Sequence, residues 1–271
     1  MNGPAVVAEN YIDIGVGKVN LKISKMFLLA VLAGAFIALA GAGASTASST
    51  LTGSAGKLVS ACVFPGGLAM VLLAGSELFT GNCLLVIPLL SRKVTAAGIL
   101  RSWIVVFLGN LVGSLLVAAI FTYSRLPASF SGALALSVIN TAAAKCKLSF
   151  ASAFLRGIAC NFLVCIAVWI SFAAKDVVGK IAGLFFPIML FVVSGFEHSV
   201  ANMFYIPAGL MAKTVPAYAQ VAADAGVDLN GLTWGAFFGG NLLPVTLGNI
   251  VGGLAVGIIY WYCYLEGKKQ D

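Results

Sequence analysis

Two stretches of the chain decide its fold: GSELFTGN at residues 75–82 and GFEHSVAN at residues 195–202. Both follow the pattern GxExxxxN, and each interrupts an apolar segment long enough to span a membrane. A Phe-Pro pair precedes each interruption, at residues 64–65 and 186–187. Because a carboxylic acid inside a membrane is costly, we expect both interruptions to have a structural or transport role.

A second pair of matching strings indicates an internal repeat. LGNLVG at 108–113 corresponds to LGNIVG at 247–252, and the order of the strings is the same in both halves. Glu197 follows Glu77 by 120 residues and Asn249 follows Asn110 by 139, so the second half carries 19 extra residues around 205–230. Because a unit of three spans crosses the membrane an odd number of times, its second copy must be inverted. The glycines of both strings are expected to let helices pack closely.

The composition excludes an ordinary soluble domain. Of 271 residues, 61% are apolar and 9% are charged, against about 25% charged in soluble proteins. Apolar segments lie at about 26–48, 58–90, 98–124, 150–174, 181–204 and 232–264. We therefore predict an all-α membrane protein of six transmembrane helices, in which helices two and five are broken. It forms one transport domain, 1–271, with an interfacial amphipathic helix at 1–25, a first repeat at 26–124 and a second at 150–264.

The charges predict the orientation of the chain. The net charge of +7 comes from short basic clusters between apolar segments, which excludes a nucleic-acid-binding arm. Six spans place both termini on one side, and the basic bias favours the cytoplasm. The first 25 residues lack the order of a signal peptide. The six cysteines lack the spacing of a metal site or a disulfide framework, so neither metal nor cofactor is expected.

The interruptions hold the residues that can carry chemistry. A break in a transmembrane helix frees backbone groups that lipid cannot satisfy. We expect Glu77 and Glu197 to accept hydrogen bonds from the freed N–H groups, and Asn82 and Asn202 to cap the half-helices that resume.

The single histidine lies inside the second interruption. The imidazole of His198 can hydrogen-bond an anion and can change its protonation near neutral pH. Thr80, in the other interruption, is expected to contact it across the pseudo-two-fold axis. Lys145 precedes the fourth span on the predicted outer side, where its charge can attract anions.

Three strings resemble the signatures of the formate/nitrite transporter family: ELFTGN at 77–82, GFEHSVANMF at 195–204 and PVTLGN at 244–249. The resemblance covers nearly the whole chain and looks strongest for the bacterial hydrosulfide-channel branch. It implies an aquaporin-like protomer in the bacterial inner membrane, assembled as a homopentamer with one pore per protomer.

The resemblance also implies roles for individual residues. The family's central histidine falls on His198, its threonine partner on Thr80, its pore asparagine on Asn161 and its vestibule lysine on Lys145. Its two apolar constrictions fall on Phe64, Leu68 and Phe191 on one side, and on Leu78, Phe79 and Val164 toward the break.

We therefore expect a passive or proton-linked pathway for small anions of weak acids, such as formate, nitrite or hydrosulfide, and no enzymatic activity. The main alternative is a neutral-solute channel of the aquaporin or ammonium type. Against it, the chain has one histidine rather than a pore pair, and no Asn-Pro-Ala string. An intramembrane protease using Ser199 with His198 is disfavoured, because adjacent residues do not easily form a nucleophile–base pair and no GxSxG elbow accompanies them.

Overall fold

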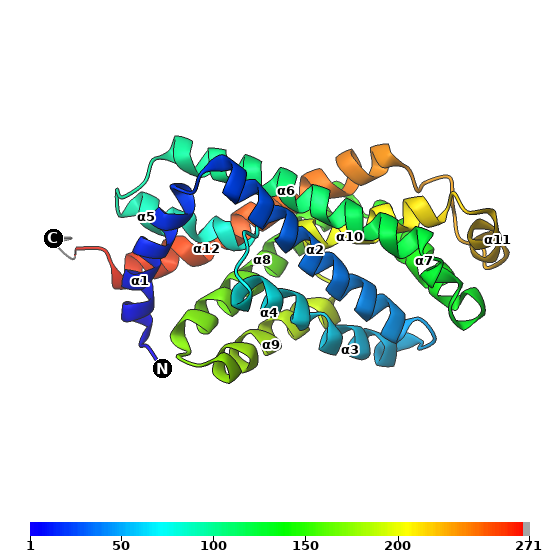
Figure 1. Cartoon of the computed structure of the whole chain (residues 1–271), viewed down its shortest axis with the longest axis horizontal. Helices are drawn as coiled ribbons and strands as arrows, with labels where there is room; N and C mark the ends of the chain where they lie inside the picture. Colours follow the sequence, from blue (N-terminus) through cyan, green and yellow to red (C-terminus); the bar gives the residue numbers. More distant parts are fainter. Residues whose placement is uncertain (268–271) are drawn as a thin grey trace.

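The computed structural model describes residues 1–267, and these form helices and loops without a strand. The molecule is elongated, with α1 and the end of α12 at one end and α7 and α11 at the other (Figure 1). The helices are α1 (Pro4–Val19), α2 (Ile23–Ser48), α3 (Gly53–Val63), α4 (Pro65–Leu73), η1 (Gly81–Leu85), α5 (Val86–Leu90), α6 (Ala96–Tyr123), η2 (Leu126–Ala128), η3 (Phe130–Gly132), α7 (Ala133–Cys146), α8 (Phe150–Ala173), α9 (Val177–Ser194), α10 (Ser199–Ala212), α11 (Pro216–Asp224), η4 (Ala236–Leu242) and α12 (Leu243–Tyr264).

Six helical segments of the described chain are long and apolar enough to cross a membrane, which confirms the predicted number. They are α2, α3 with α4, α6, α8, α9, and η4 with α12. The predicted segment at 58–90 is divided between α3–α4 and η1–α5, and the fifth segment continues past 204 as α10. Shorter apolar helices, including α10, complete the two broken spans.

A glycine ends the helix at the same point of each repeat. Gly75 follows α4 with φ +82°, and Gly195 caps α9 with φ +73°. This left-handed conformation is strained for residues with a Cβ, and glycine adopts it freely. The first residue of each GxExxxxN string therefore stops the helix and turns the chain into the break.

The glycines of the LGN strings bring two pairs of helices into close contact, as the sequence predicts. A Cβ at Gly113 of α6 would lie 2.0 Å from the Val31 carbonyl oxygen of α2, and one at Gly252 of α12 would lie 2.1 Å from the Ile158 carbonyl oxygen of α8. Backbones this close leave no room for a side chain. The crossings also place Asn110 and Asn249 next to the two breaks.

Each repeat contains a helix before its first span. α1 precedes α2, and α7, which the sequence analysis leaves as a connection, precedes α8. α1 buries residues such as Val7 and Tyr11 against the bundle, and its position on the membrane face stays a prediction. The 19 extra residues of the second repeat include α11.

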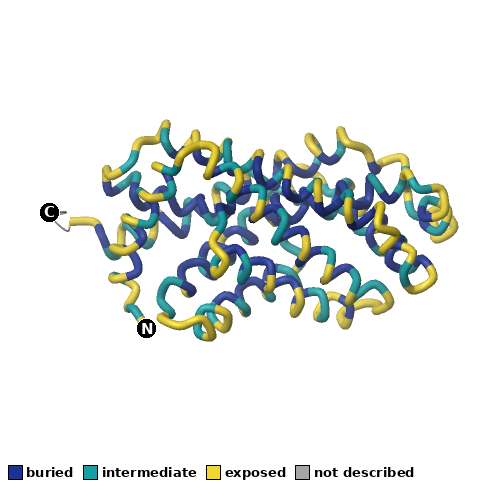
Figure 2. The backbone as a smooth tube through the Cα atoms, in the orientation of Figure 1, coloured by how far each residue is buried: buried dark blue, intermediate teal, exposed yellow. Residues whose placement is uncertain are grey.

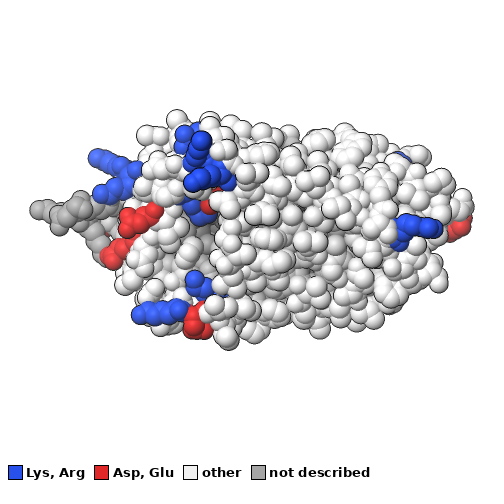
Figure 3. Space-filling model, viewed as in Figure 1, with Lys and Arg blue, Asp and Glu red and all other residues white. Residues whose placement is uncertain are grey.

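Burial and charge are distributed as in a membrane protein. Buried residues concentrate where the helices cross in the middle of the molecule (Figure 2). On the face shown in Figure 3, charged side chains gather at the two ends, and the band between them carries none. Large apolar side chains are exposed on the surface, among them Leu116 and Ile120 of α6. The long axis of Figure 1 is therefore the expected direction of the membrane normal.

Candidate transport site

Two asparagines hold the backbone of the two breaks. Asn110 accepts a hydrogen bond from the Phe79 backbone N–H at 3.0 Å and donates to the Glu77 and Ala30 carbonyls at 2.9 and 2.7 Å. Asn249 accepts from the Ser199 backbone N–H at 2.9 Å and donates to two carbonyls in the same way. These amides satisfy backbone groups that lipid would leave unpaired. We expected Glu77 to do this, and the structure assigns it to Asn110.

The carboxylates of the breaks contact side chains instead. Glu77 lies 2.8 Å from Lys18 Nζ of α1 and accepts from Asn82 Nδ2 at 2.8 Å. Glu77 is 6% exposed, so its charge is offset by the lysine rather than by water. Asn82 therefore donates to Glu77, where the sequence analysis expects it to cap a helix.

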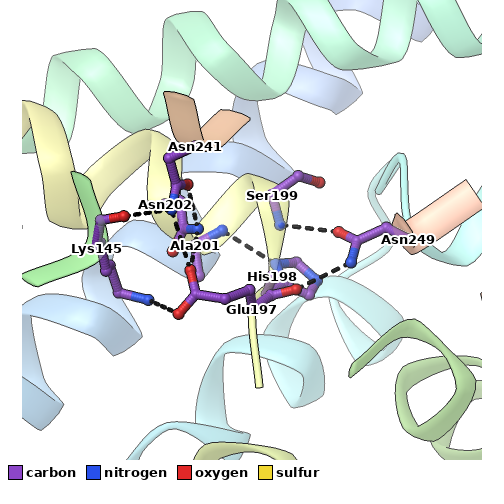
Figure 4. A network of polar contacts seen from close by, with 8 residues as sticks. All are labelled: Lys145, Glu197, His198, Ser199, Ala201, Asn202, Asn241 and Asn249. Atoms are coloured by element: carbon purple, nitrogen blue, oxygen red, sulfur yellow. Dashed lines mark hydrogen bonds and ion pairs between the residues drawn. The ribbon is translucent and has the colours of Figure 1, made fainter. Parts of the chain in front are cut away.

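The same arrangement recurs at the other break (Figure 4). Glu197 lies 2.8 Å from Lys145 Nζ of α7 and accepts from Asn202 Nδ2 at 2.6 Å. Asn241 of η4 links the two elements, because it donates to the Lys145 carbonyl at 3.0 Å and to Glu197 at 3.4 Å. Lys145 is therefore ion-paired and not a free charge at the mouth.

His198 and Thr80 meet at the centre, as the sequence predicts. Thr80 Oγ1 lies 3.0 Å from His198 Nε2. His198 is also the N-cap of α10, since its Nδ1 accepts from the Ala201 backbone N–H at 3.0 Å. Both side chains are buried.

These contacts assign the proton on the ring. A backbone N–H only donates, so Nδ1 of His198 has no proton and the neutral ring carries its proton on Nε2. Nε2–H therefore donates to Thr80 Oγ1, and the Thr80 hydroxyl keeps its own proton for another acceptor. A second proton on the ring requires that Nδ1 give up its contact with Ala201.

Asn161 of α8 lies behind this pair. Its Nδ2 donates to the Thr80 carbonyl at 3.2 Å and to the Asn249 carbonyl at 2.7 Å. Asn161 is fully buried, and it fixes the main chain at Thr80. Both contacts are with backbone carbonyls, and they place Asn161 next to the His198–Thr80 pair.

One cavity extends from the α7 end to His198, and we call it the α7 cavity. Its volume is about 190 Å³, and its lining includes Phe64, Lys145, Phe191, Glu197 and His198. The Phe64 and Phe191 rings contact edge to face at 5.8 Å, and Phe191 stacks on His198 at 5.9 Å. Two of the predicted constriction residues therefore line this cavity together with the histidine.

A second cavity lies toward α1, and we call it the α1 cavity. Its volume is about 30 Å³, which is the space of a single water molecule in the liquid. Its lining includes Tyr11, Lys18, Leu68, Leu78 and Asn82, and it shares no lining residue with the α7 cavity. The cavity on the α7 side is thus larger than the cavity on the α1 side.

The formate/nitrite transporter family model matches residues 5–262 of the chain. The chain belongs to the formate/nitrite transporter family. It is 41% identical to the probable formate transporter of Methanothermobacter thermautotrophicus, over 97% of each chain. It is 37% identical to the formate channel FocA of Escherichia coli K12, over 97% of this chain and 94% of that one.

A solved structure supports the fold of this family member. The chain matches a pentameric formate channel with formate bound, with a TM-score of 0.78 and 35% identity over 90% of this chain and 98% of that chain. The protein is therefore a multi-pass membrane protein of a family of transporters, not enzymes. These three relatives are formate transporters or channels, and none is a hydrosulfide channel. The comparisons therefore support the resemblance to the family and not the resemblance to its hydrosulfide branch.

The predicted constriction residues of this family member lie in different places. Leu68 lines the α1 cavity with Leu78, although the sequence analysis groups it with Phe64 and Phe191. Phe79 packs against Phe107 and Trp103 of α6, with ring centroids 5.1 and 6.1 Å away. Val164 is buried and lines neither cavity.

Sequence reasoning missed several residues at the site. Lys18 of α1 and Asn241 of η4 contact the glutamates of the breaks. Lys18 and Lys145 hold equivalent positions in the two repeats. A search for matched lysines before spans one and four could therefore have found Lys18. Tyr205 also lines the α7 cavity, where its ring stacks on Phe64 at 6.3 Å. No motif points to Tyr205.

Proposed function

We propose that the protein is a channel for small monovalent anions of weak acids, with formate as its leading substrate. The observation that carries this proposal is the pair of His198 and Thr80 at the end of the α7 cavity. An anion that leaves water for an apolar constriction needs strong donors in its place. The Thr80 hydroxyl proton is free for that purpose, and the neutral ring brings no fixed charge that would trap the anion.

The apolar residues form two constrictions in this proposal. Phe64 and Phe191 line the α7 cavity beside His198, and Leu68 and Leu78 line the α1 cavity. An anion sheds water at the first pair, is held by the central donors, and passes the second pair. It crosses the second pair as a neutral acid when a proton reaches it, which makes the pathway proton-linked for the more basic anions.

Flux into proteoliposomes tests the proposal. We expect formate and nitrite to permeate. Hydrosulfide is also tested, because the sequence resembles the hydrosulfide-channel branch of the family. Chloride and water complete the panel. Rapid water flux without flux of any anion would instead support the neutral-solute alternative.

His198→Asn is expected to lower formate flux by about tenfold and to weaken its dependence on pH. Asparagine is a good N-cap, so it can replace Nδ1 at Ala201, but it is too short to reach Thr80. The hydrogen bond between His198 and Thr80, two neutral groups, is lost, which is worth about 0.5–1.5 kcal/mol. The measurement is the ratio of variant to wild-type flux at each pH from about 5 to 8, where an unperturbed imidazole titrates. A ratio that stays constant across this range in a correctly assembled variant would exclude proton transfer by His198.

We propose that the protein lies in a bacterial inner membrane with cytoplasmic termini. Figure 1 places the N-terminus and the loop before α7 at opposite ends of the molecule. Single cysteines at Gly3 and Phe130 are therefore expected to react with an impermeant maleimide from opposite sides. The background replaces the partly or fully exposed Cys62, Cys146 and Cys263 by alanine. Labelling of both positions from one side would exclude this topology.

We also propose a homopentamer with one pore in each protomer. Support comes from the solved relative, which is a pentameric formate channel. In addition, residues of one chain line both cavities, so no pore needs a second subunit to complete it. The mass of the complex, without the detergent bound to it, gives the number of protomers and tests this proposal.

A further inference from the structure

The hydroxyl groups of α2 divide into two kinds. Thr46 and Ser48 each donate to a backbone carbonyl four residues earlier, at 2.8 Å, as serine and threonine in helices commonly do. Ser45, the residue before Thr46, is 9% exposed and lines the α7 cavity. Its hydroxyl has no hydrogen-bond partner among residues 1–267. A polar group that is almost buried, unpaired and directed to a cavity needs a partner from within that cavity.

Four more hydroxyls that line the α7 cavity belong to half-buried residues. They belong to Ser60 of α3, Ser137 and Thr141 of α7, and Tyr205 of α10. None of these hydroxyls bonds to a described protein group. Five hydroxyls from four helices thus line a space of about 190 Å³, together with the Phe64 and Phe191 rings.

The charged side chains near these hydroxyls do not select an anion, so the hydroxyls must do so. Lys145 is held by Glu197 at 2.8 Å and lies over the Tyr205 ring, 5.6 Å from its centroid. The pair contributes no net charge to the cavity. The adjoining mouth, of about 370 Å³, shares Ser60, Ser137 and Thr141 with it and adds the exposed Lys57. Lys57 forms no ion pair within the described chain, so it attracts every anion alike and does not distinguish among them.

We propose that Ser45, Ser60, Ser137, Thr141 and Tyr205 form a binding site for a small oxyanion, such as a carboxylate or nitrite, in the α7 cavity. A planar anion with two oxygens accepts hydrogen bonds from several directions at once, which matches donors placed on four helices. Hydrosulfide and chloride present one large, weakly accepting atom and gain less from the same donors. The site therefore selects oxyanions over hydrosulfide before His198 is reached. It rests on the proposed function, because it names the substrate class of that pathway.

Two conservative variants test the site. Ser45→Ala and Tyr205→Phe each remove one oxygen and leave the hydrocarbon packing in place, so both are expected to assemble. In the double variant, we expect the formate concentration that gives half-maximal flux to rise by about tenfold, because two hydrogen bonds are lost. The flux ratio of hydrosulfide to formate is expected to rise with it.

Two further variants serve as controls. Thr46→Ala removes a hydroxyl from the same helix that is bound to the Ala42 carbonyl, and it should leave the flux ratio unchanged. Lys57→Gln should lower formate and hydrosulfide flux by the same factor, and less so at high salt. An unchanged ratio in the assembled Ser45→Ala/Tyr205→Phe double variant would overturn the proposal. Failure of the wild-type protein to carry any anion would instead overturn the proposed function, so the two failures are distinguishable.

Discussion

Lys145→Met is expected to destabilise the protein by about 3–5 kcal/mol and to abolish most of its anion flux. The side chains of Lys145 and Glu197 are 17% and 5% exposed, so the variant leaves a carboxylate with neither a cation nor bulk water beside it. Removal of one partner of a buried ion pair has this effect in other proteins. The sequence alone suggests that Lys145 lies outside the spans and can be changed without harm to folding, and its pairing with Glu197 reverses that expectation. Thermal unfolding in detergent and elution as a single oligomer measure the loss.

The chain offers two controls for this experiment. The double variant Lys145→Met/Glu197→Gln removes both charges and should recover most of the stability. Lys147→Met breaks an exposed pair with Asp228, at 3.4 Å, and should change stability little. The backbone N–H groups of Asn230 and Gly231, followed by Lys147, hold the pKa of Asp228 below its usual value, so Asp228 stays charged without the lysine. Equal melting temperatures for Lys145→Met and Lys147→Met would contradict the structural role of the Lys145–Glu197 pair.

Asn249→Leu is expected to prevent assembly of the protein almost completely. Leucine has a similar size but offers no polar atom, so the Ser199 N–H and the Glu197 and Gly157 carbonyls lose their partner at once. In the apolar interior of a membrane protein, each unpaired backbone group costs several kcal/mol. Yield of folded oligomer and its melting temperature measure the effect.

Three variants show whether the effect belongs to the break. Asn110→Leu removes the equivalent amide at the first break and should be as severe. Asn249→Asp keeps the acceptor for Ser199 but loses both donated bonds, so an intermediate yield is expected. Asn140→Leu changes an exposed side chain and should assemble normally. If Asn249→Leu has the same melting temperature as the wild type, the asparagines do not support the breaks.

The breaks could be predicted from the sequence, but their partners could not. Glu77 and Glu197 stand out because polar residues are rare in apolar segments, and the repeat is visible because both strings recur in order. The contacts that stabilise them join distant residues: Lys18 and Glu77 are 59 positions apart, and Lys145 and Glu197 are 52 apart. Which helices cross at a break is decided by packing of all six spans. That is why the role of Asn249 needed the structure.

The lining of the pathway was harder to predict than its centre. His198 and Thr80 lie where the sequence places them, because both are fixed by the breaks themselves. The hydroxyls of the α7 cavity could not be recognised in this way. Serine in a helix usually bonds to its own backbone, and Ser45 differs from such a serine only because it lacks that bond. α7 was missed because its 14 residues are too few to span a membrane and contain polar side chains.

The unequal size of the two cavities has an electrical consequence. A transmembrane voltage falls across the part of a pathway that water does not fill. In the proposed pathway, the larger space, about 190 Å³, lies toward α7 and the smaller, about 30 Å³, toward α1, so we expect most of the voltage to fall between His198 and the α1 end. An anion at His198 would then have crossed little of the field, and we expect nearly all of the roughly 2.3 kcal/mol per 100 mV to act on its passage beside Leu68 and Leu78. If the termini are cytoplasmic, a negative interior drives anions outward at this one step, so the side chains at these two positions set how steeply flux responds to voltage.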